Sequence, residues 1–173
     1  MSHIKESFAP VSNADAKVLI LGSMPGEESL HKKQYYALPQ NTFWKIMGKL
    51  VGAHPEMLYK DRLDALQASG IALWDVLDSC ERQGSLDSNI KNESANDFAL
   101  FFAKHPHITH VFFNGTKAEQ CFKKLVQGKQ ALPPLEFCRL PSTSPAHAGM
   151  RYEEKLKCWR EKLLHTGAKL STR

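Results

Sequence analysis

Two aromatic rings and an amide follow closely on a glycine- and proline-containing turn near the beginning of the chain. The turn is Gly22-Ser23-Met24-Pro25-Gly26, and Tyr35, Tyr36 and Asn41 come after it. An apolar run at residues 17–21 precedes the turn and predicts a buried strand. Ligands of open α/β sheets bind just beyond the carboxyl ends of the strands. The spacing therefore predicts a ligand site at which a ring can stack and an amide can form hydrogen bonds.

A second candidate segment follows another expected strand and reads Leu140-Pro-Ser-Thr-Ser-Pro-Ala-His147. Three of its residues carry hydroxyl groups: Ser142, Thr143 and Ser144. Such groups can donate hydrogen bonds to phosphate oxygens, together with backbone N–H groups. The two prolines stiffen the segment, so that little ordering entropy is lost on binding. His147 is a further candidate for contact with phosphate or sugar, and exposure to solvent is its alternative.

The two segments resemble the motifs of the uracil-DNA glycosylase superfamily, and most closely those of its hypoxanthine-DNA glycosylase (deoxyinosine) branch. The resemblance covers residues 17 to about 150 and rests on the following positions: the Gly-x-x-Pro-Gly turn, Tyr36-Ala37, Pro39, Asn41, Phe43-Trp44 and the Pro-Ser-x-Ser turn. It implies an enzyme that takes a nucleotide out of the DNA stack and hydrolyses the bond between its base and its sugar.

The resemblance also implies roles for single side chains. Tyr36 corresponds to the ring that stacks on the flipped base, and Asn41 to the amide that positions the attacking water. The turn residues Gly22, Ser23 and Met24 would lie against the base. Structural alternatives remain, because Tyr36 could pack in the core and an asparagine just ahead of an amphipathic helix is a preferred N-cap.

Two positions depart from the pattern of many relatives. Met24 replaces an asparagine or carboxylate that positions or activates the water, and Leu140 replaces a histidine that stabilises the departing base. Both losses agree with the hypoxanthine branch, since a protonated purine leaves more readily and needs less help.

Asp75 ends a strand expected at residues 71–74, where several relatives carry an asparagine that reads uracil. An ionised aspartate presents only hydrogen-bond acceptors. It would suit the N1–H of hypoxanthine and disfavour the O4 of uracil, so we assign Asp75 to base recognition, with capping of a loop as the alternative. Asn114 ends another expected strand. We expect it to cap the helix that follows, and the alternative is that it bonds to the loops of the site.

Strand-like apolar runs alternate with helical patterns along the chain. The expected strands are residues 17–21, 71–74, 111–113 and 136–140, and the expected helices are residues 42–50, 55–67, 94–106, 116–127 and 151–165. A polar stretch at residues 79–91 is expected to form a long functional loop. The alternation predicts an α/β fold, a three-layer α/β/α sandwich with a four-stranded parallel sheet. The resemblance implies the strand order 2-1-3-4, and we expect a single domain over residues 1–173.

Composition limits the partners and cofactors. No run approaches the roughly 20 apolar residues that cross a bilayer, and residues 1–10 lack the apolar core of a signal peptide, so we expect a cytoplasmic protein without a membrane partner. We also expect a monomer. The formal charge of +5 and the pI near 9.0 suit DNA as a partner. Four cysteines without a Cys-x-x-Cys pair predict neither a zinc site nor an iron–sulfur cluster, so we expect no metal and no cofactor.

The leading prediction is a monofunctional DNA glycosylase of base excision repair that releases hypoxanthine from deoxyinosine. No lysine occupies a matched catalytic position, so lyase chemistry is not expected. Two alternatives stay open: a uracil or mismatch-uracil DNA glycosylase, and a non-catalytic module that binds damaged DNA.

Overall fold

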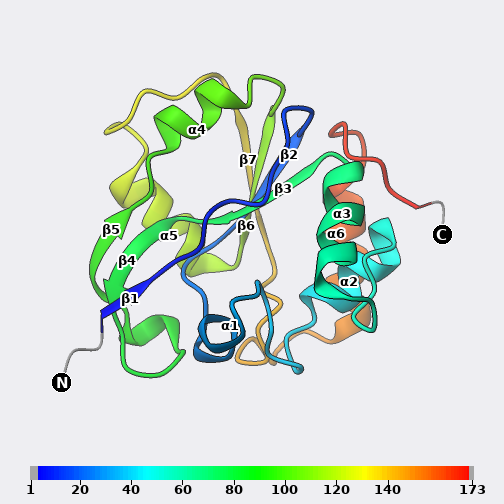
Figure 1. Ribbon diagram of the computed structural model, residues 1–173, viewed down its shortest axis with the longest axis horizontal. Helices are drawn as coiled ribbons and strands as arrows, with labels where there is room; N and C mark the ends of the chain where they lie inside the picture. The colour runs from blue at the N-terminus through cyan, green and yellow to red at the C-terminus, as the bar shows by residue number, and fades with distance from the viewer. Residues whose placement is uncertain (1–3, 172–173) are drawn as a thin grey trace.

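A parallel sheet forms the centre of the protein in the computed structural model, which describes residues 4–171 (Figure 1). Its strands are β2 (Val18–Gly22), β3 (Ile71–Asp75), β6 (His110–Asn114) and β7 (Glu136–Leu140). They lie in the order β3-β2-β6-β7, and every neighbouring pair is parallel. This is the order 2-1-3-4 of the four expected strands, so the predicted sheet is confirmed.

Strand β2 shows why the central strands are continuously apolar. Every residue of β2 and of β3 is buried. Successive side chains of a strand point to opposite faces, and accordingly Leu19 and Leu21 belong to one core while Val18 and Ile20 belong to the other. A sheet that is covered on both faces favours apolar side chains in these strands, and the one charged residue, Asp75, stands at the carboxyl end of β3.

Helices cover both faces of this sheet. One group consists of α2 (Phe43–Val51), α3 (Tyr59–Ala68) and α6 (Tyr152–Leu163), and the other of α4 (Phe98–Lys104) and α5 (Thr116–Leu125). Figure 1 shows the two groups on opposite sides of the sheet. The three-layer sandwich is therefore confirmed. A short helix, α1 (Glu27–Lys32), follows the turn that leaves β2.

An antiparallel sheet accompanies the group that contains α4 and α5, and the sequence did not predict it. Its strands are β1 (Ile4–Glu6), β4 (Leu77–Glu81) and β5 (Lys91–Ala95), in the order β1-β4-β5. The expected loop at residues 79–91 is therefore wrong at both ends. Only residues 82–90 connect the strands, and they include the 3₁₀ turn η1 (Asp87–Asn89).

The helix expected to begin at Ser94 begins later. Ser94 lies in β5, and α4 starts after Asp97, whose carboxylate accepts a hydrogen bond from the Leu100 N–H at 3.0 Å. Strand β5 has no buried residue, so its pairing with β4 depends on the backbone and leaves no apolar signal in the sequence. The polar residues from Ser94 onward, which the sequence assigned to the start of the helix, therefore precede it.

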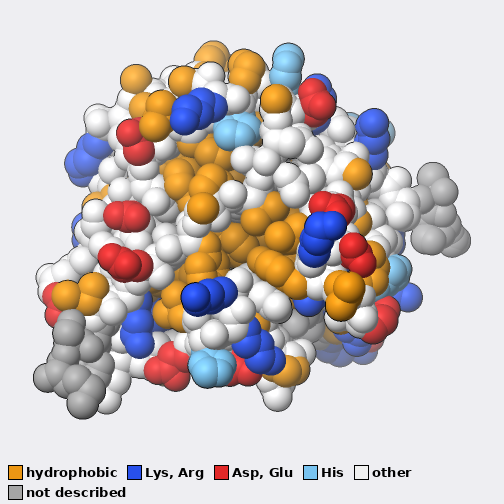
Figure 2. Space-filling view, viewed as in Figure 1, with side chains coloured by type: hydrophobic (Ala, Val, Ile, Leu, Met, Phe, Trp, Pro, Cys, Tyr) orange, Lys and Arg blue, Asp and Glu red, His pale blue; other side chains and the backbone are white. Residues whose placement is uncertain are grey.

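The face of the molecule in Figure 2 does not by itself locate a site for DNA. Figure 2 shows acidic and basic side chains interspersed around apolar surface on one face of the molecule, without a continuous basic patch there. Among residues 4–171, no helix is both long enough and apolar enough to span a membrane.

Candidate functional site

A cavity of about 780 Å³ lies at the carboxyl ends of the parallel strands. Gly22, Asp75 and Asn114, the last residues of β2, β3 and β6, all line it. Its volume is within the usual range for small-molecule sites. All of the site residues that the sequence singled out line this cavity: Gly22, Ser23, Met24, Tyr36, Asn41, Asp75, Ser142, Thr143, Ser144 and His147.

The two motif segments touch each other directly. The backbone N–H of Thr42 donates to the carbonyl oxygen of Thr143 at 3.0 Å, and the Thr42 hydroxyl donates to the same oxygen at 3.3 Å. The two residues are 101 positions apart in the chain. The start of α2 and the segment after β7 therefore form one wall of the cavity.

Asn41 both braces α2 and faces the cavity. Its carboxamide oxygen accepts a hydrogen bond from the Phe43 N–H at 3.0 Å, which fixes the orientation of the amide. A carboxamide oxygen has two lone pairs, so one remains free, and the amide NH₂ has no partner among residues 4–171. Bracing the helix and holding a water molecule use different parts of the side chain, so the two interpretations of Asn41 do not exclude each other.

The two adjacent tyrosines have different positions. Tyr35 is buried, and its hydroxyl donates to the Ala9 carbonyl oxygen at 2.9 Å. Tyr36 is only half-buried and has a left-handed backbone conformation, with φ at 53°. One face of its ring stacks on Phe43, with the ring centres 4.1 Å apart and the planes at 22°. Phe43 covers one face only, which leaves the other as the candidate stacking surface.

Asp75 and Tyr36 meet across Gly22 on the floor of the cavity. A Cβ atom added to Gly22 would lie 2.5 Å from Asp75 Oδ1 and 3.0 Å from the Tyr36 hydroxyl oxygen. The absence of a side chain at Gly22 therefore allows both groups to approach the same point. Burial raises the pKa of Tyr36 far above its usual value, so its hydroxyl stays neutral.

The carboxyl group of Asp75 is desolvated and has no strong partner. The residue is 3% exposed, and its Oδ2 atom makes no hydrogen bond within the described part of the chain. Burial raises the pKa of Asp75 to about 7, with Arg82 lowering it and Asp87 raising it further. An ionised Asp75 would only accept hydrogen bonds, but near neutral pH a large fraction of it is protonated and can also donate one.

We expect this carboxyl group to make the protein less stable as pH rises. Between a pKa near 3.8 in the unfolded chain and about 7 in the folded protein, only the folded state keeps the proton. The free energy of unfolding should then fall by up to roughly 4 kcal/mol across this range and level off above it. Asp75→Asn should remove that fall in urea unfolding measured at about pH 5 and about pH 8. The exposed Asp78→Asn is the control, and an unchanged difference for Asp75→Asn contradicts the prediction.

In the segment after β7, two hydroxyl groups can bind a ligand, and a third is buried and bonded within the protein. The oxygens of Ser142 and Ser144 each accept a backbone N–H two residues further on, at 3.1 Å, and their hydrogens remain available to donate. Thr143 is 1% exposed, and its hydroxyl oxygen accepts from the Asn114 amide at 3.0 Å. We therefore expect Thr143 to position the segment and not to contact DNA. His147 is exposed at the edge of the cavity.

Asn114 holds this segment instead of capping a helix. Its amide donates to the Thr143 hydroxyl, its carbonyl oxygen accepts the Thr143 N–H at 3.0 Å, and Gly115 takes the N-cap position of α5. Two residues of α6 add to the support. Trp159 donates to the Pro141 carbonyl oxygen at 2.9 Å, and the nearly buried Lys155 ammonium donates to that of Ser144 at 3.5 Å. Bonding of Asn114 to this segment was the alternative to capping, whereas the sequence pattern predicted neither Trp159 nor Lys155.

The connection at residues 82–90 forms the wall opposite. The Ser23 hydroxyl donates to Asp87 Oδ1 at 2.7 Å, and the Glu27 N–H donates to the Ser85 hydroxyl oxygen at 2.8 Å. Arg82 is 1% exposed and donates to the carbonyl oxygen of Pro25. The long functional loop expected here is thus shorter than expected, but it does line the cavity, to which it contributes the exposed Asp87.

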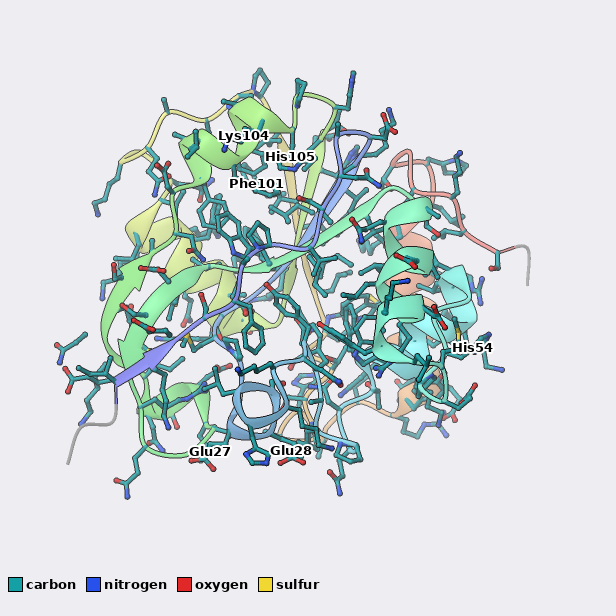
Figure 3. The ribbon with its side chains drawn as sticks, in the orientation of Figure 1. Glu27, Glu28, His54, Phe101, Lys104 and His105 are labelled. Atoms are coloured by element: carbon teal, nitrogen blue, oxygen red, sulfur yellow. The ribbon has the colours of Figure 1, made fainter. Side chains whose placement is uncertain are left out.

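His105, just after α4, lies far from the cavity and has structural partners. Figure 3 shows it near Phe101 of α4, at the opposite end of the molecule from Glu27 and Glu28 of α1, which line the cavity. His105 stacks on Phe101 and hydrogen-bonds the Ser12 hydroxyl at 2.8 Å. Within residues 4–171, no group of three or more His, Cys, Asp or Glu side chains could hold a metal ion.

Comparison with known proteins agrees with this geometry. Residues 9–165 match the family described as the uracil DNA glycosylase superfamily. The hypoxanthine DNA glycosylase of Methanosarcina barkeri is 40% identical over 115 residues, which is 66% of this chain and 73% of that protein. The hypoxanthine DNA glycosylase of Methanosarcina acetivorans is 38% identical over 145 residues, which is 83% of this chain and 89% of that protein.

A solved structure shares the fold as well. A solution NMR structure from Methanosarcina acetivorans, provisionally described as a uracil DNA glycosylase, superposes with a TM-score of 0.75 at 34% identity and covers 91% of this chain and 98% of its own. Family match, relatives and fold lead to the same conclusion: the chain belongs to the uracil DNA glycosylase superfamily.

Proposed function

We propose that this protein is a monofunctional DNA glycosylase that hydrolyses the N-glycosidic bond of deoxyinosine and releases hypoxanthine from DNA. The observation that carries the proposal is the similarity, at 38% and 40% identity, to two proteins named hypoxanthine DNA glycosylase. The cavity supports it, because a stacking ring, a base-facing carboxyl group and a free amide surround one space.

The proposed reaction needs little covalent chemistry from the protein. The flipped base stacks on the open face of Tyr36, while Gly22, Ser23 and Met24 pack against it. Asn41 holds a water molecule beneath the anomeric carbon, which becomes positively charged as the base leaves. Ser142 and Ser144 donate to the phosphates on either side, with His147 at the edge.

Asp75 selects the base in this scheme. Its carboxyl group forms a hydrogen bond to one edge of hypoxanthine, and its burial makes any unpaired contact costly. Uracil presents a different edge at a different depth, so we expect it to be the poorer substrate. Residues 1–173 act as one domain and as a monomer on DNA within the cell, without a metal or other cofactor.

Uracil release is the second candidate, because the family and the solved neighbour both carry the description uracil DNA glycosylase. A non-catalytic module for damaged DNA is the third, since Met24 and Leu140 replace polar groups of other members. The base that the protein releases, if it releases any, distinguishes the three candidate functions.

The test is base release from end-labelled duplexes that carry a single deoxyinosine, deoxyuridine or deoxyadenosine. We expect free hypoxanthine, detected by mass spectrometry, and an abasic strand that breaks only after alkali treatment. Faster release of uracil than of hypoxanthine under matched conditions would establish the second candidate. Binding of the deoxyinosine duplex without any base release would establish the third.

A further inference from the structure

The floor of the cavity carries a carboxyl oxygen that nothing in the protein satisfies. Asp75 is 3% exposed and lines the cavity, yet its Oδ2 atom has no hydrogen-bond partner within residues 4–171. Its backbone oxygen, in contrast, accepts the Asn96 amide at 2.8 Å, so the residue is held firmly in place. A buried polar atom without a partner is uncommon in folded proteins and calls for an explanation.

The surroundings of Asp75 favour its protonated form. Five charged or titratable groups influence it or respond to its charge: Arg82, Asp87, Tyr35, Tyr36 and Tyr59. Among the described residues Asp75 forms no salt bridge with Arg82, whose guanidinium donates to the Pro25 carbonyl oxygen instead. Because a buried carboxylate without an ion pair is costly, the proton stays on Asp75 up to a pKa of about 7.

The proposed reaction needs such a proton. A purine leaves its sugar much more readily when a ring nitrogen is protonated, and the histidine that many relatives use at this step is replaced by Leu140, which is 1% exposed. Two other titratable groups that line the cavity are poor acids, and His147 is exposed at the edge of the cavity. Burial raises the pKa of Tyr36 far above its usual value, and Lys117 is paired with Glu93 at 3.1 Å.

We propose that Asp75, in its protonated form, is the general acid of the reaction. This inference rests on the proposed function. As the C1′–N9 bond breaks and its electron pair moves to the base, the carboxyl group gives its proton to N7 or N3 of hypoxanthine, and the base departs neutral. The water held by Asn41 then adds to C1′, and the proton that this water loses returns to the Asp75 carboxylate. The sum is hydrolysis, with the enzyme restored.

The proposal makes Asp75 more than a group that reads the base. A base-reading side chain acts through hydrogen bonds that asparagine can imitate, because the two side chains have the same shape. A general acid must also transfer its proton, which an amide cannot do. General acid catalysis typically contributes about 10²–10⁴-fold to a rate, so the two roles predict different results for the same substitution.

The experiment is a pH profile of single-turnover hypoxanthine release by the wild type, Asp75→Asn and the control Asp78→Asn. For the wild type and the control, the rate should fall about tenfold per pH unit above about pH 7. Asp75→Asn should be slower by about 10²–10⁴-fold at pH values below this and should show no falling limb. A wild-type profile in Asp75→Asn overturns the proposal.

A second substrate separates proton transfer from binding. In a duplex with N7-methylated deoxyinosine the base is already cationic and needs no proton to leave. Asp75→Asn should therefore release this base at a rate within a few-fold of the wild type. An equal defect on both substrates would mean that Asp75 acts only in binding or folding. If the wild type releases no hypoxanthine at any pH, the proposed function itself fails, which is a distinct result.

Discussion

Asn41→Ala is expected to lower the rate of hypoxanthine release by about 10²–10³-fold, the usual loss when one positioned polar group is removed from a reacting centre. The free lone pair and the NH₂ group of Asn41 are the parts of the cavity wall that we assign to the attacking water. Without them the water is no longer held beneath the anomeric carbon. Single-turnover release from a deoxyinosine duplex measures the loss, and the affinity for that duplex should change little.

A companion variant separates this role from the bracing of α2. Asn41→Ser keeps a side-chain oxygen that can accept the Phe43 N–H but removes the amide. We expect it to retain the thermal stability of the wild type and to share the catalytic defect of Asn41→Ala. Nearly full activity in Asn41→Ser would show that the asparagine serves the helix alone.

Gly22→Ala is the second substitution for which we expect a large effect. The added Cβ would lie 2.5 Å from Asp75 Oδ1, closer than real Cβ contacts come, and 3.0 Å from the Tyr36 hydroxyl oxygen. The short, buried Asp75 side chain cannot yield without leaving its place, so both floor groups must shift. Since a displacement of about 1 Å can cost 10²-fold in rate, we expect at least that loss in hypoxanthine release.

Gly128→Ala is the matched control for this variant. Gly128 lies after α5 at φ 78° with open space around its Cα, so alanine there strains the backbone and costs about 1 kcal/mol of stability. It should lower the melting temperature without changing the rate of base release. If Gly22→Ala loses no more activity than Gly128→Ala, the close packing at Gly22 has no catalytic importance.

The parallel sheet could be predicted because burial of its strands on both faces requires several consecutive apolar residues. Val18 to Leu21 are buried on both sides, which forces an unbroken apolar run. The antiparallel sheet left no such signal. In β4 only Leu77 and Cys80 are buried, and β5 has no buried residue, so backbone pairing holds residues whose side chains resemble those of a loop.

The candidate site was predictable in its members but not in its hydrogen bonds. The end of a strand indicates which residues come to the cavity, as it does for Gly22, Asp75 and Ser142. Asn41, just ahead of α2, could be assigned from its motif. It does not tell which polar groups are used up by others. Thr143 is bound by Asn114, and Lys155 supports Ser144 from a distant helix. Those pairings depend on side-chain directions that only the folded chain defines.

The position of β2 between β3 and β6 has a consequence for how the catalytic apparatus comes into being. Gly22, Asp75 and Asn114 become neighbours only when three strands, separated along the chain by whole helices, have joined edge to edge. A fragment or a folding intermediate that lacks one of these strands therefore lacks part of the cavity floor. We expect the cavity to form together with the completed sheet, in one cooperative folding event.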